Sequence, residues 1–348
     1  MVSLAPGEEK GTLDFQLQRV PIARVEGTVV NPTGQPMANI QLTIVGSTNA
    51  LPGIDTVSTR AQAEGRFTFN NIAPGQYVIV AQTQGTGGPP PPGQSRVTVV
   101  RPEPPRYWAM TPVAIDGRNL SNVILSLQGG MTLSGTVKFD ATTLQAPADL
   151  TRVRLNLSPV ESESSLVTQA MRSSATGRVE ANGRFTLTGV VPGVYRLTGS
   201  SPSPGWFLES AVVEGQNTLD IPSEIKPSQN LTGATVTFAD RQAEVRGTVT
   251  NLRGQPAPDC TVLVFPSEPP LWLPNSVRIR TTRPATDGGF TFTGLAPGEY
   301  GIVPLGDIEP GSWFDPAVLQ QLDAGAERLT LNDGEKKVQD LKFASGGL

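Results

Sequence analysis

Short alternations of apolar and polar residues, broken by turn residues, run along most of this chain. In the stretch GRFTFNNIAPGQY (residues 65–77), Phe67 and Phe69 lie two positions apart with a threonine between them. This spacing is typical of a strand with one buried face. The Pro-Gly pair at 74–75 fits the two central positions of a type II turn. The pattern therefore predicts a hairpin whose second strand begins at Tyr77.

The hairpin pattern occurs twice more, as GRFTLTGVVPGVY (183–195) and GGFTFTGLAPGEY (288–300). Each copy follows a Gly-Thr-Val strand, and the glycines of these strands lie at 27, 135 and 247. They are about 110 residues apart, which is a domain length and too long for a solenoid repeat. We expect the hairpin aromatics to be core residues: Phe67, Phe69, Tyr77, Phe185, Tyr195, Phe290, Phe292 and Tyr300.

The predicted domains follow one another almost without spacers. Each copy closes with a strand that runs into the first strand of the next, as in residues 122–137 and 234–249. Joints this short favour a semi-rigid, elongated rod over domains on a flexible linker. The predicted domains span residues 20–128, 129–241 and 242–348.

Two segments depart from the strand pattern. The Pro-rich run TGGPPPPGQ (86–94) lies in an insertion that only the first copy carries, and its composition predicts a polyproline II loop. The run DPAVLQQLDAG (315–325) predicts a short helix, with Asp315 as N-cap and Pro316 at the first helical position.

Residues 1–19 read as a closing strand without a domain of its own. Leu13, Phe15 and Leu17 alternate with polar residues, as they do in the last strand of the chain near 332–343. Three interpretations stay open: a piece of a longer parent protein, an end that folds back on the first domain, or a strand that pairs with a neighbouring molecule. The last would link subunits head to tail into a filament.

The composition is that of an all-β protein without obvious catalytic chemistry. Glycine (37) and proline (32) are abundant, only 17% of residues are charged, and the net charge is −4 without a basic stripe. Nucleic acid is therefore an unsuitable partner. The chain has no histidine and no G-x-S-x-G motif, so we expect no enzyme activity, no metal site and no cofactor.

The motifs GTVxxxxGQP, GxFTF and PGxY resemble those of carboxypeptidase regulatory-like domains. These domains are related to the transthyretin-like and collagen-adhesin B-type repeats of bacterial surface proteins. The resemblance covers nearly the whole chain and implies three tandem antiparallel β-sandwiches of the transthyretin-like or carbohydrate-binding-like kind. It also implies a role that is usually non-catalytic, although fold alone does not transfer a ligand.

Tryptophan residues are the candidate ligand contacts, because flat aromatic faces stack on sugar rings. Trp108, Trp206 and Trp313 recur at one point of the repeat, where core packing or a domain joint is the better interpretation. Trp272 lies among prolines in a segment that reads as a loop, and the other copies have no tryptophan at the corresponding point. It is either a surface contact or a loop anchor.

Lysine, cysteine and acidic residues are the remaining candidates for chemistry. Lys138 is the best candidate for an isopeptide bond of the collagen-adhesin kind. The alternative is that it is a solvated lysine at a sheet edge. Cys260 shares a strand face with Val262 and Val264 and predicts a buried, inert thiol. The acidic residues are singletons in sequence, such as Asp116, Asp287 and Asp333, so a calcium loop is not expected.

The sequence thus favours a non-catalytic stalk or interaction module on a bacterial cell surface. The alternatives are a carbohydrate-binding module and a self-assembling filament subunit. Expected partners are other protein domains or copies of the chain, with polysaccharide as a further option. No run is long and apolar enough to span a membrane, and the extracellular location rests on the family resemblance, since the amino terminus has no signal peptide pattern.

Overall fold

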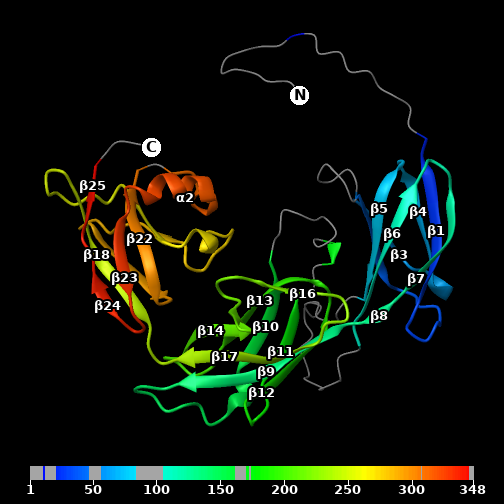
Figure 1. Cartoon of the computed structure of the whole chain (residues 1–348), viewed down its shortest axis with the longest axis horizontal. Coiled ribbons are helices and arrows are strands. Elements are labelled where there is room, and N and C mark those ends of the chain that lie inside the picture. Colours follow the sequence, from blue (N-terminus) through cyan, green and yellow to red (C-terminus); the bar gives the residue numbers. More distant parts are fainter. Residues whose placement is uncertain are drawn as a thin grey trace, which may run out of the picture. The chain divides into compact units, whose positions relative to one another are not determined.

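The structure is a computed structural model (Figure 1). It describes residues 11, 21–46, 56–83, 105–160, 170–171, 174–306 and 308–344. The Pro-rich run at 86–94 and the candidate strand-exchange residues Leu13, Phe15 and Leu17 lie outside the described residues.

The chain divides into two compact units. The first unit comprises Met1–Gln84 and Trp108–Gln128, and the second comprises Gly85–Tyr107 and Gly129–Leu348. The all-β prediction is confirmed, since six sheets account for nearly all regular structure in the described residues. The second unit holds two pairs of sheets, so the division into three domains stays a prediction.

The first unit contains two sheets, with strand orders β4-β1-β7 and β3-β2-β5-β6-β8. Its strands are β1 (Ala23–Val30), β2 (Gln41–Gly46), β3 (Thr56–Arg60), β4 (Arg66–Ile72), β5 (Gly75–Gln82), β6 (Tyr107–Ile115), β7 (Leu120–Ser126) and β8 (Gln128–Gly129), with a 3-10 turn at Ala63–Gly65.

The first pair of sheets in the second unit has the orders β12-β9-β17-β14-β15 and β11-β10-β13-β16. Its strands are β9 (Met131–Asp140), β10 (Arg154–Pro159), β11 (Ala175–Arg178), β12 (Arg184–Val190), β13 (Gly193–Ser200), β14 (Phe207–Val213), β15 (Gln216–Asn217), β16 (Ser223–Ile225) and β17 (Leu231–Ala239), with a 3-10 turn at Leu150–Arg152.

The second pair has the orders β21-β18-β24, with β25 also on β18, and β20-β19-β22-β23. Its elements are β18 (Ala243–Asn251), β19 (Thr261–Pro266), β20 (Arg280–Thr282), β21 (Gly289–Leu295), β22 (Gly298–Leu305), α2 (Pro316–Asp323), β23 (Glu327–Leu331), β24 (Lys336–Val338) and β25 (Leu341–Phe343), with 3-10 turns at Pro269–Leu271 and Ser312–Phe314.

Helix α2 matches the helix that the sequence predicts. The carboxylate of Asp315 caps it by accepting a hydrogen bond of 2.8 Å from the Ala317 N–H, and Pro316 is its first residue. Its buried residues Leu319 and Leu322 pack against Leu263 and Phe265 of β19. Strand β19 is therefore buried on both faces, which explains why it reads as a continuous apolar run.

The first and closing strands of each sheet pair are parallel neighbours. Strand β7 runs parallel to β1, β17 parallel to β9, and β24 and β25 parallel to β18. The expected antiparallel pairing holds for the other paired strands, and only this pairing of first and closing strand needs correction. The physical reason is that the two strands are separated in sequence by the rest of their copy, which is a connection long enough for parallel pairing.

The Gly-Thr-Val glycines are required by this parallel pairing. Strands β7 and β17 change register beside the glycine of the first strand, and the third closing strand is interrupted there between β24 and β25. At each of these points the closing backbone approaches the glycine Cα. A methyl group at Gly27, Gly135 or Gly247 would overlap a carbonyl oxygen of the closing strand, namely that of Val123, Ala234 or Gln339. Only glycine allows the two backbones to come this close.

The eight hairpin aromatics all lie in the cores, and none is more than 7% exposed. Tyr195 and Tyr300 fold back so that their hydroxyls donate to the carbonyls of Val191 (3.0 Å) and Ala296 (2.7 Å), four residues upstream. Burial raises the pKa of Tyr195 to about 12. The ring of Tyr195 lies over Gly193, where a methyl group would be only 3.2 Å from Cε2.

The expected type II turn at Pro-Gly is not what the chain forms. Gly75, Gly193 and Gly298 each start a strand. The first two have no positive φ, and Gly298 has a φ of 151°, far from the value of about 80° that a type II turn requires. The left-handed residues lie four positions earlier, at Asn71 (φ 62°), Gly189 (φ 70°) and Gly294 (φ 71°), where the register against the first strand shifts. The sharp backbone change is thus a β-bulge, and the later glycine provides room for the tyrosine ring.

We expect Gly135→Ala to lower the free energy of unfolding of the second unit by about 3 kcal/mol or more, because the methyl group displaces the β17 backbone. Gly129→Ala is the matched control, since its methyl group would meet no atom within 4 Å, and it should stay within about 0.5 kcal/mol of the wild type. Urea denaturation measures both. Equal stability of the two variants would contradict the role given to Gly135.

Candidate functional site

The two sheet pairs of the second unit are joined by three residues, Asp240 to Gln242, between β17 and β18 (Figure 1). The side chain of Asp240 is inaccessible to solvent and accepts hydrogen bonds from the N–H groups of Thr142 (2.8 Å) and Leu144 (2.7 Å). Burial by itself would raise the pKa of Asp240, but a hydrogen bond from the Thr142 hydroxyl and those from the N–H groups of residues 142–144 hold it far below the usual range of a carboxyl. The connection is therefore anchored on its β17 side.

Arg241 ties the connection to both sheet pairs. Its Nη2 donates to Asp140 at the end of β9 (2.6 Å), and its Nε donates to Asp333 in the turn between β23 and β24. The hydrogen bonds to Asp140 and then Asp333 raise the pKa of Arg241, so the guanidinium stays charged. One side chain thus bridges a strand end of one pair and a turn of the other.

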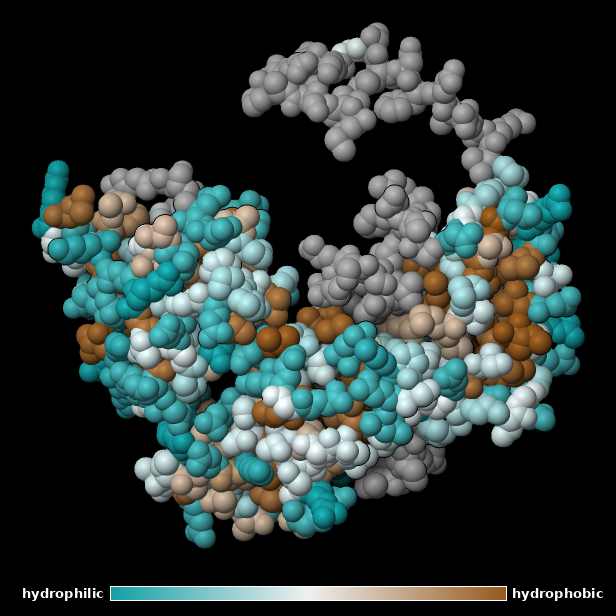
Figure 2. Space-filling model, viewed as in Figure 1, coloured by the Kyte–Doolittle hydropathy of each residue, from teal (hydrophilic) through white to brown (hydrophobic). Residues whose placement is uncertain are grey.

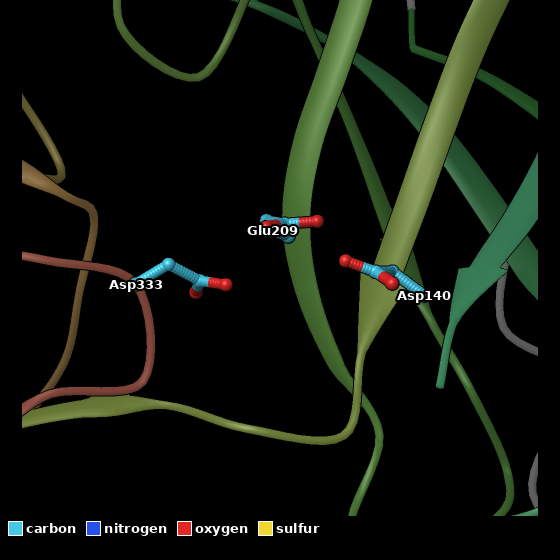
Figure 3. Close-up of side chains that lie close together, drawn as sticks. All are labelled: Asp140, Glu209 and Asp333. Atoms are coloured by element: carbon cyan, nitrogen blue, oxygen red, sulfur yellow. The ribbon is translucent and has the colours of Figure 1, made fainter. Parts of the chain in front are cut away.

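Glu209 of β14 completes a cluster of three carboxylates around this arginine. Oxygens of Asp140, Glu209 and Asp333 lie within 4.8 Å of one another, and the side chains point toward each other (Figure 3). Burial, followed by the charges of Asp333 and Asp140, raises the pKa of Glu209, and Arg241 opposes that rise. Such oxygens could also surround a cation, but Arg241 already pairs with two of them, so the cluster carries its own positive charge.

A second ion pair joins the same two sheet pairs. Arg278, in the loop before β20, donates from Nε to Asp220 Oδ1 (2.5 Å) and from Nη2 to Oδ2 (2.9 Å). The side chain of Arg278 is 13% exposed, and that of Asp220 is 14% exposed. Arg278 Nη1 also donates to the Pro297 carbonyl (2.8 Å) and to the hydroxyl of Tyr300 (3.1 Å). This bidentate, largely buried pair links the β15–β16 turn to the Tyr300 hairpin.

A cavity of about 260 Å³ lies between the two ion-pair clusters. Its apolar lining includes Phe207, Val277 and Leu295, and its charged lining consists of the clusters themselves. Phe207 and Val277 are 37% and 43% exposed. The site is therefore a joint with an ion-pair cluster on each side and a partly exposed apolar cavity between the two clusters.

The four tryptophans offer no common platform. Trp108, Trp206 and Trp272 are buried, with 3%, 7% and 6% exposed, and Trp313 is half-buried against Phe314. Trp272 Nε1 donates to the Pro266 carbonyl (2.7 Å), and its ring packs edge-to-face on Phe265. The surface interpretation of Trp272 needs correction, since a loop of apolar residues and prolines folds back over the outer face of β19 and buries the ring there.

Lys138 and Cys260 are not among the residues that line the joint cavity. Lys138 is exposed on β9, which is an interior strand between β12 and β17 and not a sheet edge. Cys260 is 3% exposed beside Val262 and Val264, as the strand pattern predicts, and burial raises the pKa of its thiol. Its reactivity is correspondingly low.

Sequence reasoning did not find the joint residues as a group. Asp140, Glu209 and Asp333 look like singletons because the chain places them far apart. The one available signal was the charged pair Asp240-Arg241 between two predicted strands. This pair indicated where the two strands connect, but it did not indicate which distant carboxylates lie beside Arg241.

We expect Arg278→Met to cost about 3 to 5 kcal/mol of unfolding free energy in the second unit, because it leaves Asp220 charged and largely buried. Asp220→Asn should have a similar cost, and the double variant should lose less than the sum. Arg66→Met is the control, because its pair with Glu64 is 75% and 72% exposed and is worth at most about 1 kcal/mol. Additive costs in urea denaturation would rule out the coupling.

Glu209→Gln should raise the melting temperature at neutral pH. A carboxyl whose pKa is raised by folding contributes stability while it is protonated, and that contribution disappears as the pH rises through its folded pKa. The advantage of the variant should therefore shrink as the pH falls below the ordinary glutamate range. The exposed Glu224→Gln serves as control in the same calorimetric series. A glutamine variant less stable than wild type at pH 7 would refute the assignment.

The carboxypeptidase regulatory-like domain family matches residues 24–106, which is less than half of the chain. No curated protein matches it. Similar solved structures include the Bacillus anthracis TIE protein, with 9% identity, 93% of this chain and 50% of that chain covered, and a TM-score of 0.20. This chain thus spans half the length of that protein.

A streptococcal ancillary pilin is 14% identical, with 93% of this chain and 100% of that chain covered and a TM-score of 0.26. A Pseudomonas aeruginosa protein, described as a candidate carbohydrate-binding protein, is 16% identical, with 31% of this chain and 90% of that chain covered and a TM-score of 0.22. The resemblance read from the sequence is thus confirmed for residues 24–106, which match the carboxypeptidase regulatory-like domain.

Proposed function

We propose that the chain is a non-catalytic, load-bearing module of a bacterial surface structure. The observation that carries this proposal is the parallel pairing of the first and closing strands in each of the three sheet pairs. We propose further that each sheet pair is one domain, with boundaries after residues 128 and 241.

Parallel pairing determines how a stretched domain is loaded. Tension enters at the start of the first strand and leaves at the end of the closing strand. Because the two strands point the same way, these points lie at opposite ends of the paired region. The force therefore shears all inter-strand hydrogen bonds together and cannot open them one at a time.

The joint in the second unit continues the same load path. Strand β17 passes into β18 through three residues, and Asp240 and Arg241 are both anchored there. The Asp220–Arg278 pair supplies a second connection away from the chain itself. Tension can thus pass from one sheet pair to the next without an extensible linker.

Other functions find less support in the described residues. The clustered carboxylates pair with arginine, and the chain has no histidine to act as a general base. Three of the four tryptophans are buried, which argues against a stacked sugar site. A location outside the cell and partners of protein nature fit a tension-bearing role. No helix of the described residues has the length and apolarity of a membrane span.

Single-molecule force spectroscopy tests the shear geometry. In a Cys260→Ser background, handles on Thr132→Cys and Thr237→Cys pull β9 and β17 from opposite ends of their pairing. Handles on Thr132→Cys and Thr232→Cys pull the same strands from one end and peel them apart. We expect the first geometry to resist several-fold higher force than the second. Similar forces in both geometries would remove the basis of the proposal.

A further inference from the structure

The three closing strands differ in what lies on their outer side. In the second unit, β14 pairs antiparallel with the outer side of β17, from Phe207 opposite Ala239 to Val212 opposite Thr235. Strand β7 and the β24–β25 pair hold the corresponding position in their sheets, and each is the last strand of its sheet among the described residues. Among the described residues, one copy of the fold thus covers this edge with a strand of its own, and two do not.

The two open edges have opposite chemistry. Strands β24 and β25 carry Lys336, Lys337 and Lys342 and are interrupted between Val338 and Leu341. Lysines and short strands are the usual protection of an edge against pairing. Strand β7 has the sequence LSNVILS without a single charge. Its Ile124 is 65% exposed, and hydrophobic residues are also visible on the surface of the first unit in Figure 2.

The sequence of β7 is complementary to itself. In antiparallel pairing, opposed residues lie on the same face of the sheet. A two-fold axis through Ile124 places Ile124 opposite its symmetry mate and Val123 opposite Leu125. The two isoleucines then cover one another on the exposed face, and the Val-Leu pairs continue the buried face, on which Leu125 is fully buried. The same operation on β24 and β25 would bring lysines together.

We propose that β7 is an interaction edge that pairs antiparallel with β7 of a second copy of this chain. The contact is isologous and joins the β4-β1-β7 sheets of two molecules into one continuous sheet. Regular pairing extends only from Val123 to Ser126, beyond the left-handed Asn122. Such a short edge buries less area than a permanent dimer needs, so the dimer is concentration-dependent in solution. Many copies side by side on a surface would reinforce it.

Analytical ultracentrifugation of the full chain tests the edge. Wild type should shift from monomer to dimer as its concentration rises, and Ile124→Lys should weaken dimerisation at least tenfold by opposing two lysines. Ile22→Lys, which changes a residue 59% exposed but outside β7, should leave it unchanged. Wild type that stays monomeric, or a dimer insensitive to Ile124→Lys, overturns the proposal. Thermal melts establish that the variants fold.

Disulfide trapping tests the register. In a Cys260→Ser background, Ile124→Cys should cross-link under mild oxidation, because directly opposed Cα atoms lie about 4.5 to 5.5 Å apart. Ser126→Cys on the same strand is the control, since the two substituted positions would be about 13 Å apart along the strands. Equal cross-linking of both overturns the two-fold pairing. A chain lacking residues 1–19 should dimerise normally, and loss of the dimer would instead assign the edge to the amino-terminal segment of the second copy.

Discussion

The parallel pairing of the first and closing strands is the constraint on which the rest of this structure depends. It brings two backbones so close that Gly27, Gly135 and Gly247 cannot carry a side chain. It places both strands in one sheet, so their inward residues and the hairpin Phe pair fill the same core. It also means that the chain enters and leaves each sheet pair at opposite ends of one hydrogen-bonded pair, which is why the copies can follow one another without spacers.

The joint between β17 and β18 illustrates how a short connection becomes a fixed one. Three residues cannot make an apolar core, so the connection is held by charge instead. Asp240 binds backbone N–H groups of one side, and Arg241 reaches carboxylates on both sides. The Asp220–Arg278 pair adds a contact at a distance, and its low exposure makes it costly to break. These contacts connect the two pairs of sheets within the compact unit that comprises Gly85–Tyr107 and Gly129–Leu348.

Repetition of one fold does not produce three equivalent surfaces. The second copy covers the edge of its closing strand with β14, and β14 also supplies Glu209 and Phe207 to the joint. The third copy covers the outer face of β19 with α2 and the Trp272 loop, and protects its edge with lysines. In the described part of the first copy, no strand covers the outer edge of β7, and β7 itself carries no lysine. The differences lie in added elements and surface charge, whereas the cores keep the same Phe and Tyr positions.

The local sequence pattern determined which strand faces are buried and where the helix begins. The pairing of distant strands determined the rest of the structure. Alternation marked Phe67, Phe69 and their repeats, the strand face of Cys260 and the helix after Asp315, because burial and capping act between residues a few positions apart. The parallel order of the strands, the bulge at Asn71 and the burial of Trp272 came only from the tertiary structure. The joint cluster could not be predicted either, since Asp140, Glu209 and Asp333 meet only after separate strands have paired. Sequence alternation encodes which face of a strand is buried, but it does not encode which distant charge will lie beside it.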